Sequence, residues 1–327
     1  MILIKQACKT VPERFSKMIT HYLTEEIQGN YHYTLGPYSQ SVLNIDPGDT
    51  VVVETLDAFG GKVVNETTLP SKVLEFPNVN PVNGPVIVNG AEKGDTLAVH
   101  IHSIKPRGSQ PRGTTCLIPF FGGLTGTQKS PTLQEPLPEL VRKVQIDETW
   151  VYWNDRLRFP YQPFIGTIGT SPELDSINSL TPDNHGGNMD LPDVSPGNTI
   201  YLPVRSTGGR LFLGDCHATQ GDGELCGVAI EFPTETAIEV DLLKGRAVTW
   251  PRIENKNWIM SVGSSRPMED AAKIAYRDIL AWMHDDFGFD RFEAYFILTQ
   301  VARARLGNMV DPNYTVGVSI EKRYLIS

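Results

Sequence analysis

Short apolar runs separated by turn residues dominate the first half of the chain after residue 40. The segments VLNIDPGDTVVVETLD at 42–57 and GPVIVNGAEKGDTLAVHIHSI at 84–104 are rich in β-branched residues and bounded by Pro, Gly, Asn and Asp, which indicates strands. Further runs, TIYLPV, RLFLGD, CGVAIEF and AIEVDLL, lie between residues 198 and 248 at a spacing of roughly 10 residues, the rhythm of an antiparallel sandwich or barrel. We therefore predict a mainly β body.

One turn phrase recurs along this body: DPGDTVVVE at 46–54, EKGDTLAVHI at 92–101 and SPGNTIYLPV at 195–204. In each phrase Gly occupies the third turn position, Asp or Asn can bond nearby backbone, and an apolar run follows that can pair into a sheet. The phrase predicts a tight turn followed by a strand. Its irregular spacing argues against a solenoid.

Helical periodicity is confined to the last part of the chain. Six apolar residues at helical spacing form a stripe that Gly288 should terminate: Ala272, Ala275, Tyr276, Ile279, Trp282 and Met283. A second helix should begin at Asp290, with Glu293 three residues on, and continue to Gly307. A strand-like run, TVGVSIEKRYLI, follows.

We accordingly expect a β-rich body at 1–250 and a small α+β part at 251–327. Residues 105–175, which are rich in Pro, Gly and Thr, are a candidate for an inserted β subdomain.

Composition and charge narrow the possible partners. The chain of 327 residues carries a formal net charge of −9 with no basic stripe, so we do not expect a nucleic-acid partner. It has no apolar stretch long enough to span a membrane, and its first residues, MILIKQACKTVPERF, lack the apolar core of a secretory leader, so we expect a cytoplasmic protein without a membrane partner. The four cysteines show no paired spacing typical of structural zinc, which favours reduced thiols.

The segment GDCHATQGDGELCG at 214–227 is the strongest candidate for a functional site. Glycines and carboxylates make it a poor helix and a poor core. Asp215 and His217 are two residues apart on a predicted strand, so they should share one face and could share one cation, while Cys216 points away. The alternatives are an acidic surface loop, or a turn-capping aspartate beside a hydrogen-bonded interior histidine.

Two further segments offer similar groups. VETLDAFGG contains Glu54 and Asp57, and DNHGGNMDL contains His185, Asn188 and Asp190. Adjacent glycines let the backbone approach a small ligand, and an asparagine there can donate and accept, although a plain turn explains the motif as well.

Within these segments the metal ligands are expected to come from five residues, which are more candidates than one zinc ion would use: Asp57, His185, Asp190, Asp215 and His217. Glu224 is the candidate proton carrier, Glu54 a partner that orients a ligand or water, and Asn188 or a nearby glycine N–H a donor to a developing oxyanion.

The roles of three other polar residues remain open. Cys226 could be a nucleophile, but its acidic neighbours would raise the pKa of a thiol. His100 and His102 share one face of a predicted strand. They could be a ligand pair, but a half-exposed polar face is the preferred interpretation.

Four motifs in order resemble the acetamidase/formamidase family. GDCHATQGDGE and NHGGNMD match its two central signatures, while VETLDAFGG and GPVIVNGAEKGDTLAVHI resemble its N-terminal segments. The resemblance covers residues from about 40 to about 245. It implies a jelly-roll-like β-sandwich and hydrolysis of a short amide to a carboxylate and ammonia with a divalent metal. The resemblance implies that the residues at the family's motif positions belong to the site. In this chain these residues are Glu54, Asp57, His185, Asn188, Asp190, Asp215, His217, Gln220, Asp222 and Glu224.

Our hypothesis from the sequence is therefore a metal-dependent amidohydrolase for a small linear amide. Zinc is the first choice of metal, with calcium or another divalent ion as alternatives, and a homodimer is expected because two-fold assemblies are the commonest. The competing hypotheses are a metal-free amidase that uses Cys226 or an activated water, a ligand-binding β-sandwich with a structural calcium, and a relative recruited to urea-like or cyclic amides.

Overall fold

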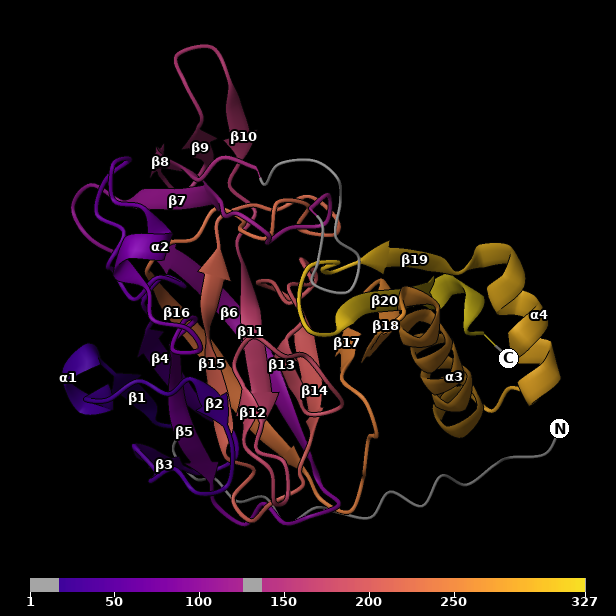
Figure 1. Cartoon of the computed structure of the whole chain (residues 1–327). Coiled ribbons are helices and arrows are strands. Elements are labelled where there is room, and N and C mark those ends of the chain that lie inside the picture. The colour runs from indigo at the N-terminus through magenta and orange to yellow at the C-terminus, as the bar shows by residue number, and fades with distance from the viewer. Residues whose placement is uncertain (1–17, 126–136, 327) are drawn as a thin grey trace, which may run out of the picture.

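A computed structural model describes residues 18–125 and 137–326 of the chain, and it is mainly β (Figure 1). The largest sheet has nine strands in the following spatial order: β1 (Thr20–Leu23), β4 (Asp49–Glu54), β16 (Thr234–Leu243), β6 (Thr96–Pro106), β14 (Thr199–Pro203), β17 (Arg252–Glu254), β18 (Trp258–Ser265), β20 (Tyr314–Glu321) and β19 (Arg303–Leu306). Its strands pair antiparallel, apart from β1 beside β4.

A second sheet of five strands packs beside the first. Its spatial order is β13 (Gly186–Asn188), β11 (Phe164–Thr170), β15 (Leu211–His217), β5 (Val82–Val88) and β3 (Leu43–Ile45). Buried residues of both sheets, among them Val99 and Ile238 of the first and Ile165 and Leu213 of the second, belong to one hydrophobic core. The body is therefore a β-sandwich, as predicted.

Smaller elements complete the body. A four-stranded sheet contains β10 (Arg158–Pro160), β9 (Trp150–Tyr152), β8 (Leu140–Ile146) and β7 (Arg112–Leu117), and a two-stranded sheet pairs β12 (Ile177–Asn178) with β2 (Thr34–Leu35). Two short helices are α1 (Glu25–Gln28) and α2 (Pro70–Val73). The four-stranded sheet falls within the segment expected as an inserted subdomain, 105–175, but the division into domains remains a prediction.

The recurrent turn is confirmed at all three places. Gly48, Gly94 and Gly197 have φ angles of 91°, 96° and 86°, which glycine adopts without strain. The backbone N–H of the next residue, Asp49, Asp95 or Asn198, donates to the carbonyl three residues earlier at 3.0–3.1 Å. Each turn therefore leads directly into a strand of the large sheet.

The two C-terminal helices are confirmed, with one correction. Helix α3 (Met268–Phe287) ends at Gly288 in a left-handed conformation, and α4 (Arg291–Val301) begins after Asp290, whose side chain accepts from the N–H groups of Phe292 and Glu293. The prediction that the second helix continues to Gly307 is wrong, because residues 303–306 form β19 and pair with β20. Backbone hydrogen bonds to β20 take the place of the last helical turns at these residues.

The segment CGVAIEF also departs from the prediction. It forms no strand in the structure, although Glu231 makes isolated bridges to Thr114 and His217. Gly227 within it has a φ of 82°, which breaks the extended conformation.

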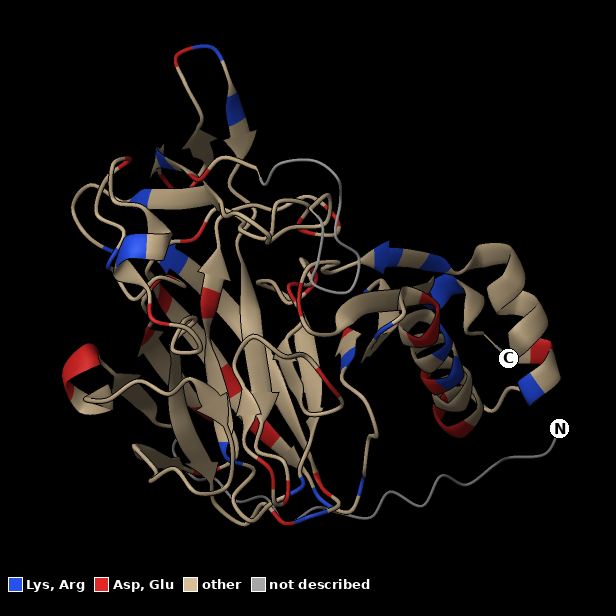
Figure 2. Ribbon diagram, in the orientation of Figure 1, with Lys and Arg blue, Asp and Glu red and all other residues tan. Residues whose placement is uncertain are grey.

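The C-terminal strands extend the large sheet instead of forming one of their own, because β17 pairs with β14 of the body. Helix α3 packs on β18 and β20, and α4 packs against α3; residues of these elements form a separate hydrophobic cluster. A 3-10 helix, η1 (Lys322–Tyr324), follows β20. Strand β19, at the edge of the large sheet, carries basic residues (Figure 2). Positive charge on an edge strand disfavours its pairing with another sheet.

Among the described residues no helix combines the length and the apolar character needed to cross a membrane.

A buried ion pair joins α3 to the sheet and gives a test of this packing. The carboxylate of Asp278 accepts from Arg252 Nε at 2.7 Å and from Ser261 Oγ at 2.8 Å, and its side chain is 3% exposed. Replacing Asp278 with Ala leaves Arg252 without its buried partner, so we expect the free energy of unfolding to fall by about 3–5 kcal/mol in denaturant titration. Asp285→Ala, on the exposed side of the same helix, should change it by less than about 0.5 kcal/mol. Equal effects of the two substitutions would contradict this account.

Candidate active site

The site is built around the end of β15. Asp215 and His217 lie on the same face of this strand, as alternation predicts, with Asp215 Oδ1 3.3 Å from His217 Nε2. Cys216 between them faces the core, where its Sγ lies 3.7 Å from Thr236 Oγ1. The neighbouring strand β11 contributes Thr167, whose hydroxyl lies 3.1 Å from Asp215 Oδ2.

Five carboxyl groups gather around His217. Each is at most 6% exposed, and they come from distant parts of the chain: Asp190, Asp215, Glu224, Glu231 and Asp311. Two overlapping groups have ligand atoms within 4.8 Å of one another: the first is Asp190, His217 and Glu224, and the second is Asp215, His217 and Glu231. His217 belongs to both groups and is the centre of the cluster.

The ring of His217 is held by Gln220. The Gln220 amide nitrogen donates to the carbonyls of Asp190 and Gly307 at 2.8 and 3.0 Å, so its oxygen faces His217 Nδ1 at 2.9 Å. An amide oxygen only accepts, which places a proton on Nδ1. His217 Nε2 therefore faces Asp215 and Glu231, at 3.3 and 3.1 Å.

A chain of amides supports the opposite side of the cluster. Asn80 Nδ2 donates to Asp215 Oδ2 and to Asn188 Oδ1, each at 3.1 Å, and Asn188 Nδ2 donates to Asp311 Oδ2 at 2.8 Å. Asn308 Nδ2 in turn donates to the carbonyl of Asn188 at 3.1 Å. The loop before β20 thus completes the site from the C-terminal part of the chain.

Burial and crowding decide the charges of these groups. Burial raises the pKa of Asp190 and of Glu224 well above the usual range, and nearby Asp311 adds to both shifts. Burial also raises the pKa of Glu231 to about 8 and that of Asp311 to about 7, although His217 opposes both shifts. The cluster therefore cannot carry its full negative charge without protons or a cation.

His217 and Asp215 behave as the charged pair within this group. Burial disfavours the imidazolium, but the carboxylates of Glu231 and Asp215 raise the pKa of His217 well above its usual value. Burial likewise opposes the charge on Asp215, yet His217 holds the pKa of Asp215 below its usual range.

Several buried polar atoms of the cluster have no hydrogen-bond partner in the described part of the chain. They include both carboxylate oxygens of Asp190 and the side-chain oxygen of Asn80. Such orphaned acceptors are costly in a protein interior, and a bound cation or a donor group is the usual compensation. The donor set of imidazole and carboxylates fits a divalent ion of the zinc class.

The backbone of the site is strained. Asn80, Asp190, Asp215 and Glu224 have φ angles of 61°, 47°, 55° and 48°, in the left-handed region that side chains other than glycine rarely adopt. Strain of this kind persists where the surrounding structure determines the conformation, and it concentrates at functional sites.

A cavity of about 70 Å³ opens over the cluster. One wall is polar and includes Asn80, Asn188, Asp215, Glu224, Glu231 and Asp311. The other wall is apolar and includes Phe59, Leu74, Phe76, Val79, Ile118 and Phe121. The space suits a small molecule with one polar and one apolar end.

The structure brings together only part of the set predicted from the sequence. Asn188, Asp190, Asp215, His217 and Glu224 all lie in the cluster, and so does Gln220.

The other predicted residues lie elsewhere. Glu54 accepts from the N–H of Glu25 at 3.0 Å and lies 3.5 Å from Arg107. The buried carboxylate of Asp57 accepts from the N–H groups of Phe59 and Gly61 and so holds the turn beneath the apolar wall.

His185, Asp222 and Cys226 are also outside the cluster. His185 is fully buried, and burial, with Arg205 nearby, lowers its pKa to about 4. Asp222 pairs with Arg305. The thiol of Cys226 donates to the carbonyl of Val228 at 3.1 Å, and Cys226 does not line the cavity over the cluster.

Sequence reasoning missed three polar residues that line the cavity. Glu231 is the one acid in the apolar run CGVAIEF, a position that signals a buried carboxylate. Asn80 and Asp311 lie in Pro- and Asn-containing loops, VNPVN and VDPN, which look like ordinary turns.

Comparison with known proteins identifies the family of the chain. A model of the acetamidase/formamidase family matches residues 21–181 and 175–323. A crystal structure of an acetamidase from Yersinia enterocolitica is 57% identical and superimposes with a TM-score of 0.93 over 95% of this chain and 94% of that one. An acetamidase from Bacillus halodurans is 30% identical, with a TM-score of 0.84 over 93% of this chain and 98% of that one.

A formamidase from Methylophilus methylotrophus is 26% identical over 67% of this chain, and the match spans 65% of that protein's length. The chain belongs to the acetamidase/formamidase family.

The glycine at position 166 tests how tightly the cluster is packed. A Cβ atom there would lie 2.6 Å from the carbonyl oxygen of Asp215 and 2.8 Å from both Asp190 Oδ1 and Asp215 Oδ2. We expect Gly166→Ala to lower the free energy of unfolding by about 1–3 kcal/mol, because the backbone of Asp215 and the two carboxylates must move within a packed interior. Gly221→Ala is the control, since a Cβ at Gly221 meets no atom within 4 Å. Calorimetric unfolding of both variants is the measurement, and an unchanged stability of Gly166→Ala would refute the packing argument.

Proposed function

We propose that this cavity hydrolyses a small linear amide to a carboxylate and ammonia. The observation that carries the proposal is a buried carboxyl group, that of Glu224, beside an imidazole and further carboxyl groups in a cavity with an apolar wall. Membership of a family that contains proteins named acetamidase and formamidase supports the same reaction.

Glu224 would move the proton in this reaction. Hydrolysis of an amide requires a group that takes a proton from the attacking water and returns it to the leaving nitrogen. The raised pKa of Glu224, which burial causes, suits a carboxyl group that must both accept and donate near neutral pH.

Two asparagines would orient the substrate. Asn80 lines the cavity, and its side-chain oxygen has no hydrogen-bond partner among the described residues, so this oxygen would accept an N–H of the substrate amide. Asn188 uses one N–H on Asp311 and retains a second, which can donate to the developing oxyanion.

A divalent ion, zinc first, would be held by His217 with the carboxylate of Asp190 or with that of Asp215, since each of them belongs with His217 to a separate ligand group. The orphaned oxygens of Asp190 and the pattern of raised pKa values support this assignment. Such an ion supplies a Lewis acid that makes water a better nucleophile at neutral pH. The imidazole ligand favours zinc over calcium, which prefers oxygen ligands alone.

The apolar wall would take the acyl part of the substrate. A cavity of about 70 Å³ limits this part to a short chain, and contacts with Phe59 and Ile118 would favour a methyl group over a hydrogen. We therefore place acetamide ahead of formamide as the substrate. Glu54, Asp57 and His185 have no contact with the substrate in this proposal.

We further propose a cytoplasmic homodimer. The thiols of Cys116, Cys216 and Cys226 are free, which suits a reducing compartment. The dimer rests on the frequency of two-fold assemblies among enzymes.

Release of ammonia from acetamide tests the reaction. We expect the wild-type protein to release ammonia, and Glu224→Gln to lower kcat by about 100-fold or more, because it removes the proton carrier while keeping the size of the side chain. Glu173→Gln, in an exposed ion pair with Lys93, is the control and should retain full activity. Wild-type-like turnover by a folded Glu224→Gln protein would rule out the proposed role.

A further inference from the structure

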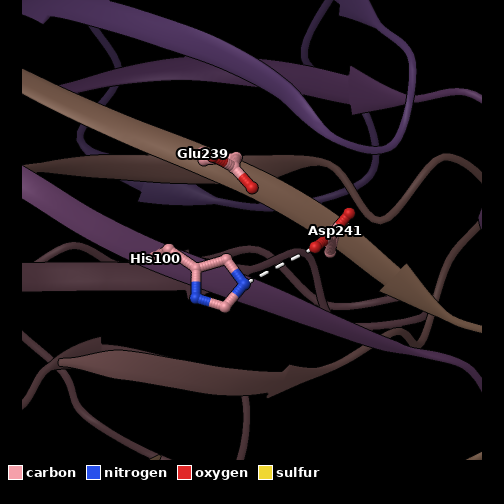
Figure 3. Close-up of side chains that lie close together, drawn as sticks. All are labelled: His100, Glu239 and Asp241. Carbon is pink, nitrogen blue, oxygen red and sulfur yellow. Dashed lines mark ion pairs between the residues drawn. The ribbon is translucent and has the colours of Figure 1, made fainter. Parts of the chain in front are cut away.

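A second group of metal-ligating side chains lies on the outer face of the nine-stranded sheet. His100 comes from β6, and Glu239 and Asp241 come from the neighbouring strand β16 (Figure 3). One ligand atom of each residue lies within 4.8 Å of the other two, and His100 Nε2 is 3.5 Å from Asp241 Oδ2. We call these three residues the outer-face cluster.

The register of the two strands produces this arrangement. Glu239 lies directly opposite His100, and Asp241 is two residues further along β16, so both carboxylates project on the face that carries His100. The alternate residues Val99 and Val240 are fully buried on the other face. The outer-face cluster is therefore held by two paired strands near the middle of a large sheet, and its geometry does not depend on a loop.

A third strand supports the histidine ring. Thr199 of β14 lies opposite His100, and its hydroxyl oxygen is 2.7 Å from His100 Nδ1. When this hydroxyl accepts the Nδ1 proton, the Nε2 lone pair faces the carboxylates. A bond from the second ring nitrogen is the usual support of a histidine that binds a metal.

The charges of the outer-face cluster call for a cation. In the described residues no lysine or arginine lies within 4.0 Å of Glu239 or Asp241, and the ion-pair partners of these two carboxylates are histidines. Two carboxylates on one face of a strand repel each other, and the chain as a whole carries a net charge of −9.

A β-bulge brings a further histidine towards this cluster. The register between β6 and β16 shifts at Ala237 and Ile238, which leaves His102 without a partner in the ladder. Its Nε2 lies 3.1 Å from Glu239 Oε2. Bulges commonly re-aim a side chain in this way.

We propose that His100, Glu239 and Asp241 bind a divalent cation of the zinc class and thereby clip β6 to β16. One imidazole and two carboxylates, with water completing the shell, suit Zn²⁺, Co²⁺ or Ni²⁺ better than Mg²⁺ or Ca²⁺, which prefer oxygen ligands. The side chains of His100 and Asp241 are 37% and 45% exposed, so the ion can enter from solvent. This site shares no residue with the five carboxyl groups around His217, which we call the acid cluster, and it does not depend on the proposed reaction.

Zinc stoichiometry tests this proposal. Metal-free full-length protein is dialysed against a zinc buffer, and the bound zinc per chain is measured by mass spectrometry. We expect His100→Ala to bind one zinc fewer than the wild type, whatever number the acid cluster binds. His21→Ala is the matched control, because His21 pairs with one carboxylate, Asp49, and should leave the stoichiometry unchanged.

Thermal unfolding gives a second measurement. Zinc should raise the Tm of the wild type and of His21→Ala by more than it raises the Tm of His100→Ala, because the clip stabilises only the folded state. Magnesium at the same concentration should not produce this difference. Equal zinc content and equal Tm shifts in the wild type and His100→Ala would overturn the proposal.

Discussion

The burial of five carboxyl groups around His217 is the constraint on which the site depends. At these buried positions, neighbouring carboxylates raise one another's pKa, whereas His217 and Asp215 stabilise each other's charged forms. The remaining acids must hold protons or share a cation. Burying carboxyl groups so close together lowers the stability of the fold. The raised pKa values that result allow these groups to accept and release protons.

A strand and a network of amide hydrogen bonds hold these groups in place. Strand β15 carries the charged pair, the amide chain from Asn80 to Asp311 fixes the opposite side, and Gln220 sets the tautomer of His217. The C-terminal part contributes Asp311 from a loop between two strands of the large sheet. The site therefore requires both the sandwich and the C-terminal strands.

The sequence predicted the mainly β architecture, the recurrent turn, and the two late helices, because each depends on local periodicity and turn chemistry. The prediction made the second helix too long, because the pairing of residues 303–306 with β20 depends on contacts that are distant in the sequence. At the site, the close spacing of Asp215 and His217 allowed their common face to be predicted. Asn80, Glu231 and Asp311 reach the cluster only through tertiary folding. The loops of Asn80 and Asp311 carry no local signature, and the apolar run around Glu231 signals burial but not the partners of the carboxyl group. The motif identified His185 as a candidate, but the sequence could not show that this residue is buried outside the cluster.

Diffraction at the zinc absorption edge tests the central claim most directly. For crystals equilibrated with zinc, the account predicts an anomalous peak in contact with His217 Nε2 and the carboxylate of Asp190 or of Asp215. Crystals of fully active protein that show no peak at this position, even with zinc in excess, would contradict the view that a shared cation compensates the buried charge.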